Sequence, residues 1–359
     1  MTGGAPIASR TELVTLVEKD VAEIAAFIAN QSRRTPDAVS RHLRWFLLEN
    51  PAHQPQDPLG FGLRFADQLV GCILCSPQDF RFENKRMLLM GSSSFYVDER
   101  HRGHGGRIFL QYARLAKQWP LFGTSANSDA AALWKAAGGR PIPYSDGELF
   151  GVLHWPPVAE EFVHRRYANR LLSRLAGNPI ANLAALLRPL KIDVGKSDAL
   201  RSLTSAEQVN DLPIHDASPK LTALRDLAYI HWRYFSCGDA TAAVFAFRSR
   251  MSDKEILVTV NQRTRGYRGQ ITALNVLDVY PEVPADEWLR IVATLAQRYC
   301  KTVDAVVLRS QNPKQQHFFC EQGFQLRPFD APTGWFIDKA GFLPTEDWYP
   351  VPADGDGLI

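Results

Sequence analysis

The sequence predicts an α/β protein of two domains, each a mixed sheet flanked by helices, joined by a helical connector. The apolar run Leu88–Val97 is typical of a buried strand, and after a glycine-rich turn apolar residues recur at helical spacing as far as Trp119. Similar pieces return near residue 200, and a basic segment lies between the two halves. At 359 residues the chain has room for two cores. We therefore expect domains at 1–155 and 200–359, with the connector at 156–199.

Composition excludes several classes of function. A formal charge of +3 is too small to argue for nucleic-acid binding by itself. The sequence contains no apolar run near the roughly 18 residues that cross a bilayer, and its start does not resemble a secretory signal. We expect a cytoplasmic protein without a transmembrane segment.

Cysteine usage favours reduced thiols, because the five cysteines are few and odd in number. Cys72 and Cys75 have CxxC spacing within an apolar run. Residues three apart on a strand face opposite sides of the sheet, so we interpret them as buried structural thiols and expect no metal.

In the first domain, the sequence predicts two helices, then a β-hairpin, and later a short strand followed by a helix. Helices are predicted near 18–28 and 35–47, followed by strands near 60–66 and 69–76 that Asp67 and Gln68 join as a hairpin. A short strand at 121–126 leads into a helix that begins after Asn127.

The turn after Val97 is basic and rich in glycine, from Arg100 to Arg107. A strand that stops at glycines and restarts as a helix leaves backbone N–H groups at the positive end of the helix dipole. Such a turn predicts an anion site that a diphosphate would fit. A basic surface loop is the other interpretation of the same residues.

Two motifs resemble those of the GNAT acyltransferase superfamily. The run Val97-Asp98-Glu99-Arg100-His101-Arg102-Gly103-His104-Gly105 resembles its pyrophosphate-binding signature, in which a strand ending in Val leads into Arg-Gly-x-Gly-x-Gly/Ala. The run from Asn127 to Gly139 resembles its second signature, Asn-x-x-Ala-x-x-Leu-Tyr-x-Lys-x-Gly-Phe. Arg107 stands where a final Gly or Ala is usual, and Trp134 stands where many members carry a general-acid Tyr.

The resemblance implies transfer of acetyl from acetyl-CoA, or of another acyl group, to an amine of a small-molecule or sugar acceptor by direct attack. It also implies two splayed strands with pantetheine between them. Asn127 would reach the pantetheine or order the adjacent loop. The implied cofactor-binding residues are Phe95, Tyr96, Val97, Arg102, Gly103, His104, Gly105, Gly106, Arg107, Asn127 and Trp134.

The proton carriers are less defined, because position 134 is Trp and the corresponding residue of the second half is Phe319. We take Tyr96, Glu99 and Ser93 as the catalytic candidates. Asp98, His101 and His104 are also able to carry protons, and each of these groups has a structural interpretation as well. A water molecule could instead protonate the leaving thiolate.

The second half repeats landmarks of the first. Trp232 follows Trp45 by 187 residues, and Asn312 follows Asn127 by 185. The stretch Val279–Glu287 replaces the glycine-rich turn with prolines and acidic residues, which would not hold a diphosphate. We predict an internal duplication whose second copy is degenerate and contributes to an acceptor pocket or stabilises the first.

Three alternatives stay open. The chain could bind or sense CoA without turnover, or it could be an aminoacyl transferase of the FemAB type, which also pairs two GNAT-like domains. The basic, amphipathic stretch 160–191 could contact an anionic membrane or a phosphorylated substrate, although we favour a connector that packs on the domains. The sequence does not define the oligomeric state.

Overall fold

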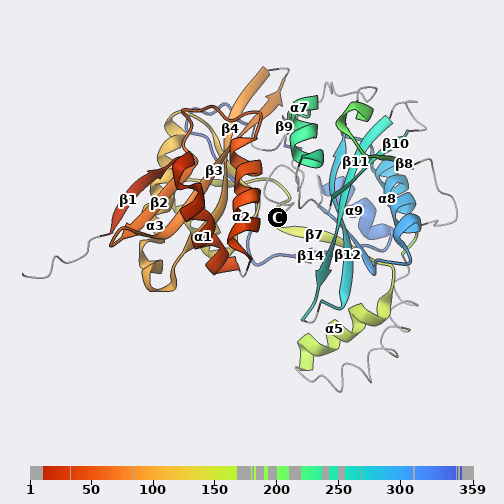
Figure 1. Cartoon of the computed structure of the whole chain (residues 1–359). Helices are drawn as coiled ribbons and strands as arrows, with labels where there is room; N and C mark the ends of the chain where they lie inside the picture. The colour runs from red at the N-terminus through yellow and green to blue at the C-terminus, as the bar shows by residue number, and fades with distance from the viewer. Residues whose placement is uncertain are drawn as a thin grey trace, which may run out of the picture.

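The computed structural model contains two mixed sheets with helices on their faces, which confirms the predicted α/β architecture (Figure 1). It describes residues 11–32, 34–83, 85–167, 179, 182, 190–192, 200–209, 220–236, 242–249, 255–267, 269–309, 312–344, 346 and 348–349. Within these ranges, no helix is both long and apolar enough to span a membrane. The same residues contain no cluster of His, Cys, Asp and Glu side chains suited to a metal ion.

The first sheet has the strand order β1-β2-β3-β4-β5-β15-β6, with β9 paired to β3. Its strands are β1 (Glu12–Leu16), β2 (Gly60–Phe65), β3 (Gln68–Phe82), β4 (Lys85–Val97), β5 (Leu121–Gly123), β6 (Arg140–Pro141), β9 (Thr222–Ala223) and β15 (Trp335–Ile337). The predicted hairpin is present, since β2 and β3 pair antiparallel up to Phe65 and Gln68. Ala66 and Asp67 both have positive φ, at 48° and 62°, as a tight two-residue hairpin turn requires.

Helices cover both faces of this sheet. On one side lie η1 (Glu18–Asp20), α1 (Val21–Ser32), α2 (Pro36–Leu43) and the π-helical turn η2 (Arg44–Leu48). On the other lie η3 (Glu99–His104), α3 (Gly105–Ala113), η4 (Arg114–Lys117) and α4 (Ser128–Ala136). Cys72 packs in the α1 core and Cys75 in the α3 core, so the two thiols face opposite sides as predicted.

The second sheet has the order β14-β7-β13-β12-β11-β10-β8. Its strands are β7 (Gly147–Val152), β8 (Leu200–Leu203), β10 (Ala242–Arg248), β11 (Glu255–Arg265), β12 (Ile271–Tyr280), β13 (Ala305–Leu308) and β14 (Gln325–Pro328). The second half also contains five helical segments: η5 (Ala206–Val209), α7 (Leu227–Ile230), the π-helical turn η6 (His231–Phe235), α8 (Ala285–Tyr299) and α9 (Pro313–Glu321).

Each half contributes strands to the sheet of the other, and β9 and β15 of the C-terminal half both pair in the first sheet. β7 pairs antiparallel with β13 and β14 in the second sheet, where Figure 1 shows it among the strands of the C-terminal half. β15 pairs antiparallel with β5 and β6 in the first sheet. Cuts at 155 and 200 therefore do not separate the two sheets, because each sheet is completed by a strand from the other side of the proposed connector.

The start of the connector is α5 (Trp155–Tyr167), which runs along one end of the second sheet (Figure 1). Val158, Ala159 and Val163 are buried, while Phe162 is 64% exposed. Most of the basic stretch 160–191 lies outside the described residues, so both interpretations of it stay predictions.

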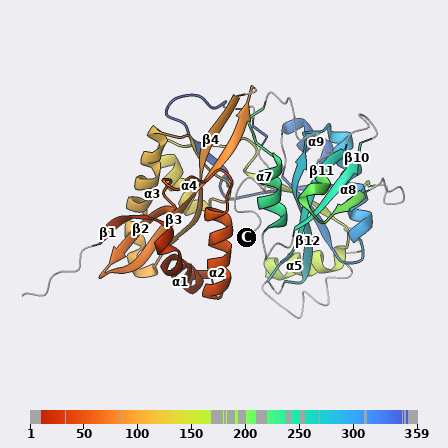
Figure 2. The ribbon, with the colours of Figure 1, turned by 45° about the horizontal axis from the view of Figure 1, so that its top comes forward.

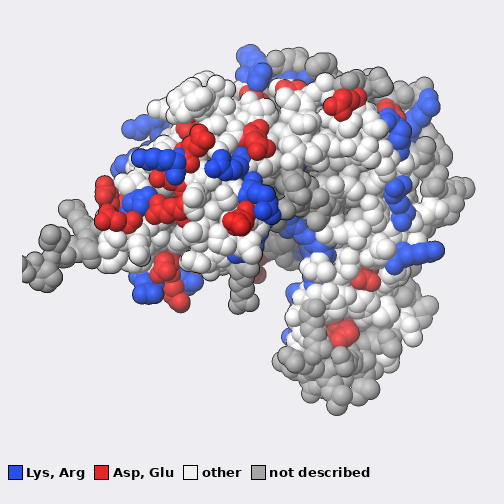
Figure 3. All heavy atoms as spheres, in the orientation of Figure 1, with Lys and Arg blue, Asp and Glu red and all other residues white. Residues whose placement is uncertain are grey.

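One apolar core spans the boundary between the halves. It joins residues of α1, α2 and β3 to residues of η6, β10 and β12. Both ribbon views show α2 and α7 facing each other across this boundary (Figure 2). On the face seen in Figure 3, acidic and basic side chains are interspersed over the first half, so that face presents no field of a single sign.

Candidate functional site

The neighbouring strands β4 and β5 separate at the centre of the first sheet. They are parallel and pair only at Met90 with Leu121 and at Gly91 with Phe122. Beyond this point β4 continues to Val97, whereas β5 ends at Gly123. A pocket of about 830 Å³ opens between β4, α3 and α4, with Gln31 of α1 also in its lining.

A bulge in β4 decides which side chains face which side of the pocket. Cys72 pairs with Tyr96 and Leu74 with Ser93, so Ser94 and Phe95 together oppose the single residue Ile73. Ser94 has a φ of 49°, in the left-handed region that few residues other than glycine adopt. After the bulge, Phe95 and Val97 pack on the α3 core. Tyr96 packs on the α1 core.

The glycine-rich turn is helical. Gly105 is the first residue of α3, and its N–H donates to the Arg102 carbonyl of the preceding η3. Asp98 accepts bonds from the N–H groups of Arg100 and His101. The expectation that this turn leaves its backbone donors unpaired therefore holds only in part, because η3 runs directly into α3.

The glycines contribute space rather than unusual backbone angles. A Cβ on Gly105 would lie 3.6 Å from both Phe95 Cζ and Val97 Cγ2, and one on Gly106 would lie 3.9 Å from Leu133 Cδ2. Gly105 and Gly106 line the pocket, so a longer side chain at either position would project into it. The wall at the start of α3 thus leaves room for a bound group close to the backbone.

The two arginines of this turn have different surroundings. Arg102 is exposed and lines the pocket. Arg107 lies outside the lining, and its Nη1 donates to Thr11 Oγ1 at 2.7 Å. Arg102 of η3 therefore faces the pocket, whereas Arg107 of α3 faces away from it.

α4 forms the opposite wall. Asn127 Oδ1 accepts a bond from the Ala130 N–H at 2.9 Å and thereby caps the helix. Trp134 is 2% exposed and packs edge-on against Phe109 and Tyr112, with ring centroids 5.3 Å and 5.8 Å away. The second-signature motif therefore supplies a helix start at the pocket and an indole at its inner end.

A buried tyrosine lies where the strands divide. Tyr112 Oη donates to the Met90 carbonyl at 2.8 Å and lies 3.3 Å from the Phe122 carbonyl, one oxygen from each strand. Burial raises the pKa of Tyr112 well above its ordinary value, although the Ser92 hydroxyl partly offsets this effect. The phenol thus keeps its proton at neutral pH and bonds to backbone at the split.

The structure gathers most of the predicted site residues around this pocket. Those in the lining are Ser93, Phe95, Tyr96, Val97, Arg102, Gly105, Gly106, Asn127 and Trp134. Those outside the lining are Glu99, Gly103, His104 and Arg107. Glu99 is exposed on η3.

Sequence reasoning missed several lining residues, among them Gln31, Ser92, Gly123, Ser125 and Asp129. The run Ser92-Ser93-Ser94 was a visible signal, since three adjacent hydroxyls interrupt an otherwise apolar strand. Gln31 had no signal, because only the packing of α1 on the sheet brings it to the pocket.

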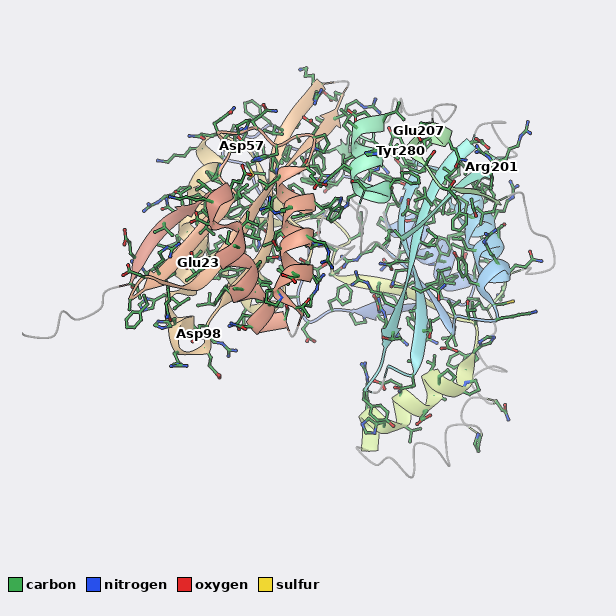
Figure 4. All side chains as sticks on the ribbon, viewed as in Figure 1. Glu23, Asp57, Asp98, Arg201, Glu207 and Tyr280 are labelled. Carbon is green, nitrogen blue, oxygen red and sulfur yellow. The ribbon has the colours of Figure 1, made fainter. Side chains whose placement is uncertain are left out.

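The corresponding region of the second half is built differently. β12 and β13 pair from Ala273 to Asn275 on the β12 side, and β12 then continues to Tyr280. There Asp278, 1% exposed, accepts bonds from Arg225 Nε at 2.8 Å and Tyr234 Oη at 2.6 Å. Asp98, just after β4, and Tyr280, which ends β12, lie in separate halves (Figure 4).

No protein-family model matches the sequence, and no curated protein matches it. Solved structures do match in fold. Saccharomyces cerevisiae N-myristoyltransferase with bound myristoyl-CoA has a TM-score of 0.57 at 11% identity, covering 93% of this chain and 80% of that one. A GCN5-related N-acetyltransferase from Anabaena variabilis has a TM-score of 0.54 at 10% identity, covering 91% of this chain and 72% of that one.

A probable N-acyltransferase from Enterococcus faecalis gives the same TM-score of 0.54, also at 10% identity, with 91% and 72% of the two chains covered. The chain therefore has the two-domain α/β fold of GNAT-type N-acyltransferases. At this identity the likeness concerns the fold alone.

Proposed function

We propose that the protein is an acyl-CoA-dependent acyltransferase that transfers acetyl from acetyl-CoA to an amine of a small-molecule or sugar acceptor. The observation that carries the proposal is the pocket between the separated strands β4 and β5. Its mouth is lined by Arg102 and the first residues of α3, and its inner end by Trp134. An elongated ligand with an anionic end fits such a pocket.

The residues present suit a thioester of CoA. The edge of β4 from Phe95 to Val97 is not paired with β5, so its backbone groups can bond the amides of pantetheine. Arg102 and the positive end of the α3 dipole would hold the diphosphate. Bound CoA would supply the activated acyl group, and the protein would orient it beside the acceptor.

The acceptor would approach from the α1 side, between the two halves of the molecule. Gln31 and Ser93 line the pocket together with Tyr96, and the bulge turns Tyr96 toward the α1 core. In the proposed mechanism the neutral amine attacks the thioester carbonyl and Tyr96 or Ser93 helps to remove its proton. The exposed position of Glu99 favours these two residues over it.

A second candidate function is binding of CoA without turnover. The buried indole of Trp134 favours it, because an indole at this position cannot protonate a leaving thiolate. The two functions share the same pocket and differ only in whether thiol is released.

Calorimetry with acetyl-CoA and free CoA tests the binding step. Arg102→Ala is expected to weaken binding about 10- to 100-fold, as loss of a charge-assisted hydrogen bond would. Arg107→Ala is the matched control, because its guanidinium bonds to Thr11 outside the lining. Equal losses in both variants, or no binding by the wild type, would contradict the site.

Release of CoA thiol in the presence of candidate amines then separates the two functions. Turnover that depends on the amine supports the transferase. Tight binding with no thiol release across a broad amine panel would favour the binding protein.

A further inference from the structure

We propose that Ser92 is a further catalytic residue, whose hydroxyl donates a hydrogen bond to the sulfur of the thioester. The inference rests on the proposed function and adds a residue that neither signature motif contains. Ser92 is the first residue of β4 beyond the last pair with β5, and it lines the pocket.

The reacting end of the donor is expected at this depth. With the diphosphate at Arg102, the arm of CoA would run along the β4 edge from Val97 toward the split. The five residue steps from Val97 to Ser92 span about 16 Å at roughly 3.3 Å each. The thioester is at the end of the arm away from the diphosphate, so it would lie near the inner end of the pocket.

The Ser92 hydroxyl points across the gap toward β5. A Cβ placed on Gly123 would lie 2.7 Å from Ser92 Oγ and 2.9 Å from Trp134 Cζ2. Hydroxyl and indole therefore both pack closely on the bare backbone of Gly123, side by side at the inner end of the pocket. This end of the pocket lies beside the position where many GNAT members would present a tyrosine.

The neighbouring polar groups are less suited to the role. Tyr112 is fully buried, and its phenol donates to the Met90 carbonyl at the strand split. The Ser92 hydroxyl bonds to the Tyr112 oxygen and would turn from it to reach the sulfur. Ser93 is one step along β4 from Ser92 and so faces the other side of the sheet. The Trp134 atoms nearest Gly123 are the ring carbons Cζ2 and Cε2, which cannot donate a hydrogen bond. Ser92 is therefore the hydroxyl that both lines the inner end and faces the α4 side.

The chemistry requires a donor rather than a full acid. When the amine nitrogen bonds to the carbonyl carbon and the C–S bond breaks, the electron pair passes to sulfur. The amine proton passes to the base on the acceptor side. An alcohol is a much weaker acid than a thiol, so Ser92 keeps its proton and stabilises the developing thiolate, which then takes a proton from water.

The isosteric pair Ser92→Thr and Ser92→Val tests this role, because only the first keeps a hydroxyl. Ser92→Val is expected to lower kcat about 10- to 100-fold, since hydrogen bonds to charged groups are the strong ones. Its affinity for acetyl-CoA, measured by calorimetry, should stay within about threefold of the wild type. Ser92→Thr should recover most of the lost kcat.

Equal kcat in the Thr and Val variants, or an effect confined to KM, would overturn the role of Ser92 while leaving the proposed function intact. A wild type that binds acetyl-CoA but acylates no amine would overturn both. Should Ser92→Val fold poorly by circular dichroism, Ser92→Ala carries the same comparison without added bulk.

Discussion

Trp45 and Trp232 exchange hydrogen bonds across the boundary between the two halves. The Nε1 of each indole donates to the backbone carbonyl of the other at 2.7 Å, and the two rings stack with centroids 5.6 Å apart. Each tryptophan is the second residue of a five-residue π-helical turn. The two tryptophans therefore occupy equivalent positions in the two halves, and their contacts are related by a local two-fold axis.

The strand exchange follows the same relationship. In the first sheet β15 lies between β5 and the short edge strand β6, and in the second sheet β7 lies between β13 and the short edge strand β14. β5 and β13 are each paired in parallel with the strand on their other side. This match, together with the spacing of 187 residues between the tryptophans, supports the inference of an internal duplication.

The reciprocal indole bonds predict a measurable coupling. Trp45→Phe or Trp232→Phe removes one hydrogen bond to a buried carbonyl, which is expected to cost about 1–3 kcal/mol of unfolding free energy. The cost should be smaller for Trp45→Phe, because the Trp232 carbonyl also accepts from Ser236 Oγ at 2.8 Å. The loss in the double variant should differ from the sum of the two single losses by more than about 0.5 kcal/mol, because the residues touch. Urea unfolding measures all three, and strict additivity would contradict a coupled pair.

Gly123 is predicted to be required for the pocket more than for the fold. A methyl group there would meet Ser92 Oγ at 2.7 Å and Trp134 Cζ2 at 2.9 Å, so these side chains must move into the space that a ligand would use. Gly123→Ala should reduce acetyl-CoA affinity at least tenfold while costing about 1–3 kcal/mol in stability. Gly138→Ala offers a comparison away from the pocket: nothing lies within 4 Å of its Cβ position, and its φ of 85° makes alanine costly there through backbone strain alone. Unchanged affinity in Gly123→Ala would count against the placement of the donor.

Alanine variants of the two asparagines that cap α4 and α9 distinguish an effect on binding from an effect on stability. Asn127 and Asn312 each accept a backbone N–H three residues on, at 2.9 Å and 2.8 Å. Replacement of either by Ala should cost about 1 kcal/mol, the usual value of such a cap. Asn127→Ala should also weaken acetyl-CoA binding, because α4 walls the pocket, whereas Asn312→Ala should not. Thermal denaturation and calorimetry on both variants check this, and equal binding losses would point to a general effect of stability.

Stability should fall at alkaline pH, in part through Cys72. Burial raises the pKa of this thiol from 9.0 to about 12. Above pH 9 the unfolded chain therefore releases the thiol proton while the native chain keeps it, so the free energy of unfolding falls as pH rises toward 12. Cys72→Ala should flatten this dependence by up to about 1.4 kcal/mol per pH unit. Urea unfolding at pH 8, 9 and 10 under reducing conditions measures the slope, and an unchanged slope would show that Cys72 does not contribute.

Much of the local structure could be predicted from the sequence. Alternating and helical apolar spacing located β2, β3, β4 and α3, and the helix predicted after Asn127 is α4. Gly105 and Gly106 of the glycine-rich turn line the pocket, and their role in binding stays a prediction. The helical conformation of the turn was not foreseen, since glycine permits several backbone shapes and tertiary contacts select among them.

The sequence by itself determined the repeated landmarks and the strand, turn and helix around Val97. These depend on neighbours within a few positions, where side-chain spacing and capping act directly. Only the tertiary structure decided that β7 and β15 change sheets, that Arg102 faces the pocket while Arg107 faces away, and that Ser92, Gly123 and Trp134 meet. Such pairings join residues far apart in the chain, and a strand or helix carries no local signal that names its distant partner.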